Sequence, residues 1–399
     1  MAAEQASSRP AVRPISRPAG QTTNAPPPGA LGELKILDFS RVLAGPLATM
    51  VLADLGAEVT KVERPGGGDE TRAWGPPYDE RGAQSTYFQS VNRNKGSVVL
   101  DLAADEGRAE ARRLAREADV VVENFRPGVM EKLGLGYEEL RAANPGLVYC
   151  SVTGFGSGEE GAALPGYDLL VQALGGLMSI TGEPDGPPLK VGVALVDVVA
   201  GLFAAVGILA ALRHREASGR GQRVEVDLLS ALLAALVNQA SGYTVAGAVP
   251  ERLGNAHPSI SPYELYATGA GDLVLAVGND RQFGELCAEL GRPELAADPR
   301  FATNPARVEH RTALRAELES ALATRAAAEW AAALTARRVP AGVVNDLAGA
   351  FAFAAELGLD PIVEVPRGDG GPPVPLTRNP IRLSETPPTY RSAPPPLPR

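Results

Sequence analysis

One acidic residue stands alone in a long apolar stretch of this sequence. Asp197 is the only ionisable residue between Lys190 and Arg213. A carboxylate in such surroundings caps a helix, forms an ion pair or reacts. The residues alone favour the cap, because an Asp at a helix start stabilises the helix by about 1 kcal/mol. A helix N-terminus also keeps a carboxylate ionised, and an ionised carboxylate in an apolar pocket is a competent nucleophile.

A set of basic residues in the first half of the chain could bind an anionic ligand, although each one alone is more simply a solvated surface residue. The set consists of Lys61, Arg64, Arg93, Lys95, Arg126 and Lys132. The run 123–134 is the most specific part of it. There Asn124 and Phe125 end an apolar segment, and Gly128 lets the backbone come close to a ligand. Arg126 and Lys132 could then flank a phosphate.

Other motifs are weaker or absent. The chain has no GxGxxG after its first predicted strand, no GxxxxGK[ST] and no GxSxG. These absences argue against a nucleotide cofactor held by such loops and against a serine hydrolase. The glycines of GFGSG (154–158) are more simply a turn. His257, in GNAHPS, could act as a base, although a loop His beside Pro is more often structural.

The composition is that of an acidic globular protein. Hydrophobic residues make up 45% of the 399 residues and the formal net charge is −9. A large core can therefore form, and nucleic acid is not an expected partner. The two cysteines and three separated histidines give neither a disulfide framework nor a zinc pattern. We expect no metal, no tightly bound cofactor and a cytoplasmic location. Because Asp197 interrupts the apolar segment 191–212, this segment is more simply a buried helix than a membrane span, and no membrane partner is expected.

Strands and helices alternate between residues 31 and 185. Apolar runs predict buried strands at 34–39, 58–63, 97–102, 119–123 and 147–152. Helices are predicted between them, at 47–55 and 105–117. This alternation predicts an α/β fold with a parallel sheet covered on both faces. Ligands usually bind at the carboxyl ends of such strands.

A smaller α/β domain is predicted to interrupt this doubly wound domain. A polar, glycine-containing segment follows residue 214, and residues 224–245 predict a long apolar helix. The predicted divisions are a disordered extension at 1–30, the first part of the large domain at 31–214, a linker at 215–224, the small domain at 225–325, a return to the large domain at 326–385 and a proline-rich tail at 386–399.

Several motifs in order together resemble the family III CoA-transferases. They are DFSRVLAGPLATMVLADLGAEVTKVERPGGGDETR (38–72), NRNKGSVVLDL (92–102), ADVVVENFRPGVMEKLGLGYEEL (118–140) and RHREASGRGQRVEVDLLSALL (213–233). The segment 254–283, GNAHPSISPYELY…LVLAVGNDRQF, is most similar to the branch that acts on succinate-type or other dicarboxylic acids. The resemblance runs from about residue 31 to 383.

The resemblance implies a Rossmann-like large domain built from both ends of the chain and a homodimer whose subunits interlock. It also implies a nucleophile, an Asp that follows the acid of a G-Y-[DE] motif by 29 residues. Here that motif is PGYD, so the nucleophile is Asp197 rather than a cap alone. The implied CoA- and substrate-binding residues are Val42, Leu43, Ala44, Arg64, Leu100, Asn124, Phe125, Arg126, Lys132, Tyr167 and Asp168. The candidate lid is Gly254, Asn255, Ala256 and His257.

The chain departs from the family at two positions. Pro165 stands where a CoA-contacting Lys is found in the family, so one CoA contact is missing. The sequence GNAHPS replaces the glycine-rich lid of formyl-CoA transferase, which argues against oxalate or formate as substrates.

The implied activity is the transfer of CoA from a succinyl-CoA-like donor to a carboxylic acid, through aspartyl anhydride and aspartyl-CoA thioester intermediates. The acyl-CoA is then a substrate and no tightly bound cofactor is needed. One alternative is an acyl-CoA racemase of the same fold. That relative has a catalytic His where this chain has Tyr167, and a phenol is a poor base at neutral pH. The other alternative is a non-catalytic acyl-CoA-binding protein, against which the presence of Asp197 speaks.

Overall fold

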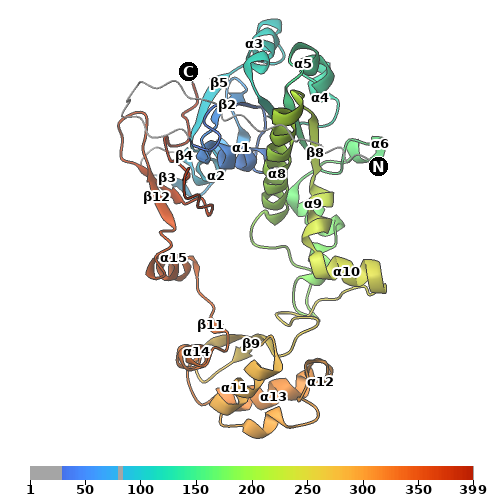
Figure 1. Cartoon of the computed structure of the whole chain (residues 1–399), viewed down its shortest axis with the longest axis vertical. Helices are drawn as coiled ribbons and strands as arrows, with labels where there is room; N and C mark the ends of the chain where they lie inside the picture. The colour runs from blue at the N-terminus through green and yellow to red at the C-terminus, as the bar shows by residue number, and fades with distance from the viewer. Residues whose placement is uncertain (1–28, 80–83, 399) are drawn as a thin grey trace, which may run out of the picture.

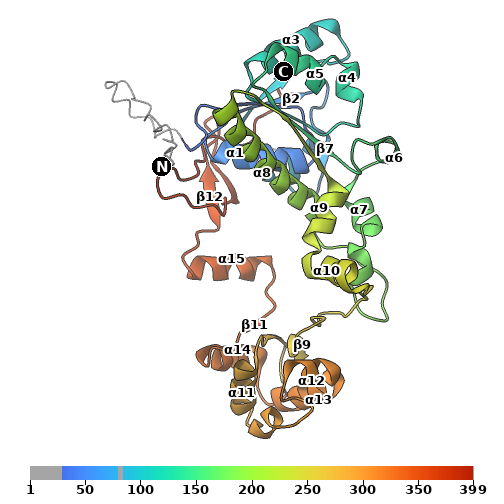
Figure 2. The ribbon, with the colours of Figure 1, turned by 45° about the vertical axis from the view of Figure 1, so that its right-hand side comes forward.

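The computed structural model describes residues 29–79 and 84–398. The extension predicted over residues 1–30 lies, up to residue 28, outside the described residues. Two domains are joined by two separate segments, so that the chain forms an open ring (Figures 1 and 2).

A six-stranded parallel sheet forms the centre of the large domain, in the order β5-β2-β1-β6-β7-β8. Every neighbouring pair in it is parallel. This confirms the predicted α/β fold with a parallel sheet. The strand order reverses between β1 and β6, and such a reversal leaves a crevice at the carboxyl ends of the two strands. The strands are β1 (Lys35–Asp38), β2 (Glu58–Glu63), β5 (Lys95–Val99), β6 (Val120–Glu123), β7 (Val148–Thr153) and β8 (Arg223–Asp227).

Helices cover both faces of this sheet because successive strand residues point to opposite faces. Ile36 and Val120 pack beneath α1 (Ala44–Asp54), α8 (Leu195–Ser218) and α9 (Leu228–Ala235). Leu37 and Val121, one position further along each strand, pack on the other face. That second face is covered by α3 (Asp105–Glu117), α4 (Val129–Lys132) and α5 (Tyr137–Ala143).

The chain after α8 differs from the sequence prediction. The single helix predicted over 224–245 is wrong, because its start is the edge strand β8, whose sequence RVEVD alternates between apolar and charged residues. Asp227 ends this strand and caps α9 by accepting a hydrogen bond from the backbone N–H of Ser230 at 2.7 Å. A bend of 85° separates α9 from α10 (Val237–Ala246). The structure thus places 215–235, which the sequence divided between a linker and the small domain, in the large domain.

The small domain is a three-stranded antiparallel sheet with helices packed against it. The strand order is β11-β10-β9, and the core contains Phe283, Phe301 and Trp330. Trp330 lies on α14, so the stretch 327–343, assigned from the sequence to the large domain, lies in the small one. The elements are β9 (Tyr263–Ala267), β10 (Asp272–Ala276), α11 (Asp280–Glu289), η3 (Pro293–Ala296), α12 (Asn304–Glu309), α13 (Arg311–Leu322), α14 (Ala327–Ala336) and β11 (Ala341–Val343).

The chain returns to the large domain through α15 (Leu347–Glu356) and the hairpin of β12 (Ile362–Val365) and β13 (Val374–Thr377). The proline-rich segment then runs without helix or strand along the large domain. Asn94 holds it there, donating from its amide nitrogen to Thr389 O at 2.7 Å and from its backbone to Ser392 O at 2.9 Å. The remaining short elements are η1 (Glu70–Ala73), β3 (Tyr78–Asp79), β4 (Gln84–Ser85), α2 (Thr86–Ser90), α6 (Glu159–Ala162), α7 (Asp168–Leu174) and η2 (Leu177–Ile180).

Two helices carry apolar side chains that no other described part of the chain covers. Val206 on α8 is 62% exposed, and Leu347 on α15 is 81% exposed. None of the residues of α15 is buried. Helix α8 also has the length and apolar composition of a membrane span, a property that core helices of soluble proteins share. Its other side packs on α1 and the sheet.

Candidate active site

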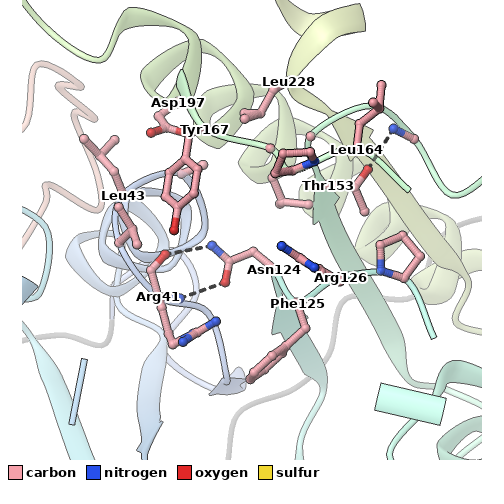
Figure 3. Close-up of a pocket in the computed structure, with 18 of the residues that line it drawn as sticks. Arg41, Leu43, Asn124, Phe125, Arg126, Thr153, Leu164, Tyr167, Asp197 and Leu228 are labelled. Atoms are coloured by element: carbon pink, nitrogen blue, oxygen red, sulfur yellow. Dashed lines mark hydrogen bonds between the residues drawn. The ribbon is translucent and has the colours of Figure 1, made fainter. Parts of the chain in front are cut away.

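A pocket lies at the point where the strand order reverses. The loop 41–44 after β1 and the loop 124–127 after β6 form one side of it, and Tyr167 and Asp197 form another (Figure 3). Its volume is about 170 Å³. Pockets that enclose a drug-sized ligand usually measure roughly 300–1,000 Å³. A single chain can therefore enclose only one end of a ligand as long as an acyl-CoA.

Asp197 lies at the third position of α8, after an Ala194 N-cap that has no side-chain acceptor. The interpretation of Asp197 as the cap is therefore wrong. Asp168 caps the helix instead, because its Oδ1 accepts hydrogen bonds from the backbone N–H groups of Val196 at 2.8 Å and Asp197 at 3.3 Å. Gln172 in turn donates to Oδ2 of Asp168 at 2.6 Å. Asp168 thus positions Asp197 through the backbone, and no described residue donates a hydrogen bond to the Asp197 carboxylate.

Burial, and secondly the nearby Asp168 carboxylate, raise the pKa of Asp197 to about 7. The expectation that the helix N-terminus would keep this carboxylate ionised is therefore corrected. Removal from water and a like charge both disfavour the ionised form, and they outweigh the helix dipole. At neutral pH the carboxyl is divided between its two protonation states.

Tyr87, on α2, is not among the residues that line the pocket, although the charges of Asp197 and Asp168 act on it. Burial raises its pKa to about 12, with smaller contributions from the charges of Asp197, Asp168 and Asp69. The phenol therefore keeps its proton at neutral pH. Nothing in the sequence STYFQ distinguishes this Tyr, because only the fold brings α2 within range of these charges.

The structure brings most of the residues implied by the resemblance together around Asp197. The pocket is lined by Val42, Leu43, Ala44, Asn124, Phe125, Arg126 and Tyr167. Arg64 lies in a smaller adjoining cavity on the other side of Phe125. Leu100 packs in the core on the opposite face of the sheet, and Lys132 is exposed on α4. Neither of these two lines a described pocket.

The candidate lid, Gly254, Asn255, Ala256 and His257, is not at this pocket. It lies in the segment between α10 and the small domain, where the backbone N–H of Gly254 donates to Gly182 O at 3.0 Å. The His257 ring stands against Tyr263, with ring centroids 5.2 Å apart. Within one chain these four residues do not line the pocket of Asp197.

Three members of the basic set are buried in ion pairs. Lys61 pairs with Asp69 at 2.9 Å, Lys95 with Asp38 at 3.1 Å and Arg93 with Asp54 at 2.6 Å. They are therefore neither solvated surface residues nor free to bind an anion. Arg64, Arg126 and Lys132 remain exposed. In the described part of the chain, no group of three or more His, Cys, Asp or Glu side chains is placed to hold a metal ion.

Comparison with known proteins gives one consistent result. A family model, CoA-transferase family III, matches residues 31–398. A succinate–glutarate CoA-transferase of Agrobacterium fabrum is 45% identical over 94% of this chain and 94% of its own length. An acetyl-CoA:oxalate CoA-transferase of Acetobacter aceti is 41% identical over 91% of this chain and 92% of its own. The crystal structure of a CAIB/BAIF family protein from Brucella suis superposes with a TM-score of 0.82 at 43% identity, covering 93% of this chain and 97% of that one.

Proposed function

Because the chain belongs to CoA-transferase family III and is a CoA-transferase, we propose that it moves CoA from a succinyl-CoA-like donor to a carboxylic acid through covalent intermediates on Asp197. One observation carries this proposal. The Asp197 carboxylate stands in a pocket at the switch point of the sheet, with no described hydrogen-bond donor to occupy it. A nucleophile needs such a free and accessible lone pair.

The proposed reaction exchanges one carboxylate for another on CoA. The Asp197 carboxylate attacks the donor thioester carbonyl, which gives a mixed anhydride and CoA thiolate. The thiolate then attacks the Asp197 carbonyl, which gives an aspartyl-CoA thioester and releases the donor acid. The acceptor carboxylate attacks this thioester, and the thiolate released attacks the acceptor carbonyl of the new anhydride. The product acyl-CoA leaves and the Asp197 carboxylate is restored.

One feature of the described chain suits this chemistry. The N-terminus of α1, whose N-cap Leu43 has no side-chain acceptor, faces the pocket beside Asp197. Its backbone N–H groups could stabilise the tetrahedral oxyanions. The anhydride must also be protected from water, and the loop 254–257 of a partner subunit is our candidate for this.

The experiment that tests the proposed function is the capture of the covalent intermediate. Protein incubated with succinyl-CoA and no acceptor should carry CoA on the peptide that contains Asp197, as the mass of CoA less one water. Addition of glutarate should discharge the adduct and form glutaryl-CoA. A panel of carboxylic acids that includes oxalate then defines the acceptor. A racemase or a non-catalytic binder would give no adduct, and that result would overturn the proposal.

The pH dependence of the reaction should follow the ionisation of Asp197. Because only the ionised carboxylate is nucleophilic and the pKa of Asp197 is raised to about 7, kcat/KM for acyl-CoA should rise with pH through a midpoint near pH 7 and level off at higher pH. Asp168→Asn removes the neighbouring charge but keeps an oxygen that can accept the Val196 N–H, so the midpoint should move to lower pH. Asp227→Asn, a cap substitution on α9, is the matched control and should leave the midpoint unchanged. An Asp168→Asn midpoint equal to that of the wild type would contradict the assignment.

A further inference from the structure

Val42, in the loop that lines the pocket, has an unusual backbone conformation. Its φ is +69°, in the left-handed region that L-residues rarely occupy and that β-branched residues occupy least of all. Such a conformation persists only where surrounding contacts hold it. The residue lies between β1 and α1, directly before the N-cap Leu43. Contacts from neighbouring segments must therefore hold this loop.

Asn124 holds the residue before Val42 with both atoms of its side-chain amide. Its Oδ1 accepts the backbone N–H of Arg41 at 2.8 Å, and its Nδ2 donates to the backbone oxygen of Arg41 at 2.7 Å (Figure 3). The amide thus pairs with Arg41 as a neighbouring strand would. It fixes the peptide groups on both sides of Arg41, including the one that leads into Val42.

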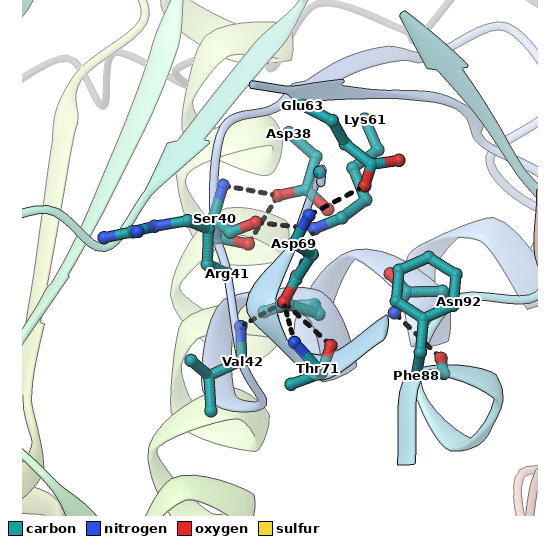
Figure 4. Close-up of polar contacts among 12 residues, drawn as sticks. Asp38, Ser40, Arg41, Val42, Lys61, Glu63, Asp69, Thr71, Phe88 and Asn92 are labelled. Carbon is teal, nitrogen blue, oxygen red and sulfur yellow. Dashed lines mark hydrogen bonds and ion pairs between the residues drawn. The ribbon is translucent and has the colours of Figure 1, made fainter. Parts of the chain in front are cut away.

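A buried ion pair holds the loop from the other side. Asp69 Oδ1 lies 3.5 Å from the backbone nitrogen of Val42, and its Oδ2 lies 2.9 Å from Lys61 Nζ. Lys61 also donates to the backbone oxygen of Ser40 at 2.7 Å (Figure 4). The side chains of Lys61 and Asp69 are both fully buried. They therefore cannot reach a ligand, but they fix the backbone on either side of Arg41.

The position of this loop is also coupled to the helix of Asp197. A Cβ atom added to Gly201 of α8 would lie 2.5 Å from the backbone oxygen of Ala44. The start of α1 therefore lies directly against α8, one helical turn after Asp197. A shift of residues 42–44 would alter the wall of the pocket that faces the nucleophile.

We propose that Asn124 is a positioning residue, which holds Val42 in its left-handed conformation and so keeps the loop 41–44 in place to receive acyl-CoA. This inference rests on the proposed function. It replaces the direct CoA contact that the resemblance implied for Asn124 by an indirect role, because the amide oxygen and nitrogen are both engaged with Arg41.

A double-mutant cycle between positions 42 and 124 tests the proposal. Glycine adopts a positive φ at no steric cost, so Val42→Gly removes the strain that Asn124 is inferred to hold. In the wild-type background, Asn124→Ala should lower kcat/KM for acyl-CoA by about a hundredfold. In the Val42→Gly background the same substitution should lower kcat/KM about tenfold less than in the wild type. This difference is the equilibrium ratio that corresponds to the free-energy cost of the left-handed conformation in an L-residue. The KM for the acceptor acid should change little.

A direct contact between Asn124 and CoA would give a different result. If Asn124 contacted CoA directly, its removal would cost the same factor in both backgrounds, and this equality would overturn the proposal. Where Asn124→Ala does not fold, Asn124→Asp runs the same cycle, because a carboxylate can accept the Arg41 N–H but cannot donate to its carbonyl.

Two measurements without turnover separate this proposal from the proposed function. Hydrogen exchange of the peptide 41–47 in the ligand-free protein should be faster in Asn124→Ala than in the wild type. Unchanged exchange would overturn the positioning role of Asn124. Calorimetry with CoA alone reports binding in every variant. A wild-type protein that neither binds CoA nor transfers it would overturn the proposed function, whereas the exchange result would still stand.

Discussion

Replacement of Asp197 by Asn should lower kcat for CoA transfer by about 10⁴-fold or more while the protein stays folded. The carboxamide keeps the shape of the side chain but cannot attack a thioester to form an anhydride. When a covalent pathway loses its nucleophile, the residual rate reflects binding alone. The CoA adduct on this peptide should disappear with the activity.

The same variant should be more stable than the wild type at pH 8. The pKa of Asp197 is raised from its ordinary value of 3.8 to about 7 in the folded protein. Below about pH 3 the carboxyl is protonated in both the folded and the unfolded states, so it does not change the free energy of unfolding. Between about pH 3 and pH 8 the unfolded state ionises first, and the folded state loses stability progressively as pH rises. Above about pH 8 the loss is constant and amounts to a few kcal/mol.

Thermal unfolding of Asp197→Asn and of the wild type should therefore agree near pH 3 and diverge up to about pH 8. At pH 8 the variant should unfold several degrees higher. Asp227→Asn is the matched control, because Asp227 also lies at a helix start but acts as a cap; this variant should keep its activity. Near-normal turnover by Asp197→Asn would end the nucleophile assignment. A variant less stable than the wild type at pH 8 would contradict the burial of an ionisable group.

Sequence reasoning could single out Asp197, the proposed nucleophile, but not the residue that positions it. Asp197 stands out because charge is rare in an apolar helix, and such a signal is local. Its partner Asp168 lies 29 residues away and acts through two backbone N–H groups. A contact of this kind leaves no periodic pattern in the sequence. The pKa of Asp197 depends on that neighbour and on burial. For this reason the sequence could not predict that the pKa of this carboxyl is raised, and the expectation of an ionised carboxylate was wrong.

The basic residues show the same limit. Lys61 lies within a predicted strand and Lys95 just before another, and both were expected either to bind an anion or to be solvated. Both are buried and paired with Asp69 and Asp38, and such pairing depends on which strands become neighbours. Strand β8 was missed for a related reason. Its five residues precede a helical apolar run, and an edge strand of that length has too few residues to show its period clearly.

Subunits of this protein should not exchange in native buffer. Val206 of α8 and Phe353 of α15 are 62% and 54% exposed, and α15 has no buried residue. A ten-residue apolar helix with no buried residue is not stable alone in water, so we expect a partner to cover it. An exposed apolar surface of this kind is commonly satisfied by a second copy of the chain. We therefore propose a homodimer, in which the lid loop of one subunit can close the pocket of the other.

The ring shape of the chain determines how such a dimer can dissociate. Two segments join the large and small domains, one through α10 and the other through α15 (Figures 1 and 2). A partner threaded through this ring cannot leave unless a domain unfolds, so the exchange rate should equal the unfolding rate. Tagged and untagged protein mixed in native buffer should form almost no hybrid dimers over days, as measured by native mass spectrometry. Hybrids should appear only when denaturant reaches the unfolding transition, which serves as the positive control. Rapid hybrid formation without denaturant would contradict the interlocked arrangement of the subunits. A stable monomer in light scattering would contradict the proposed homodimer.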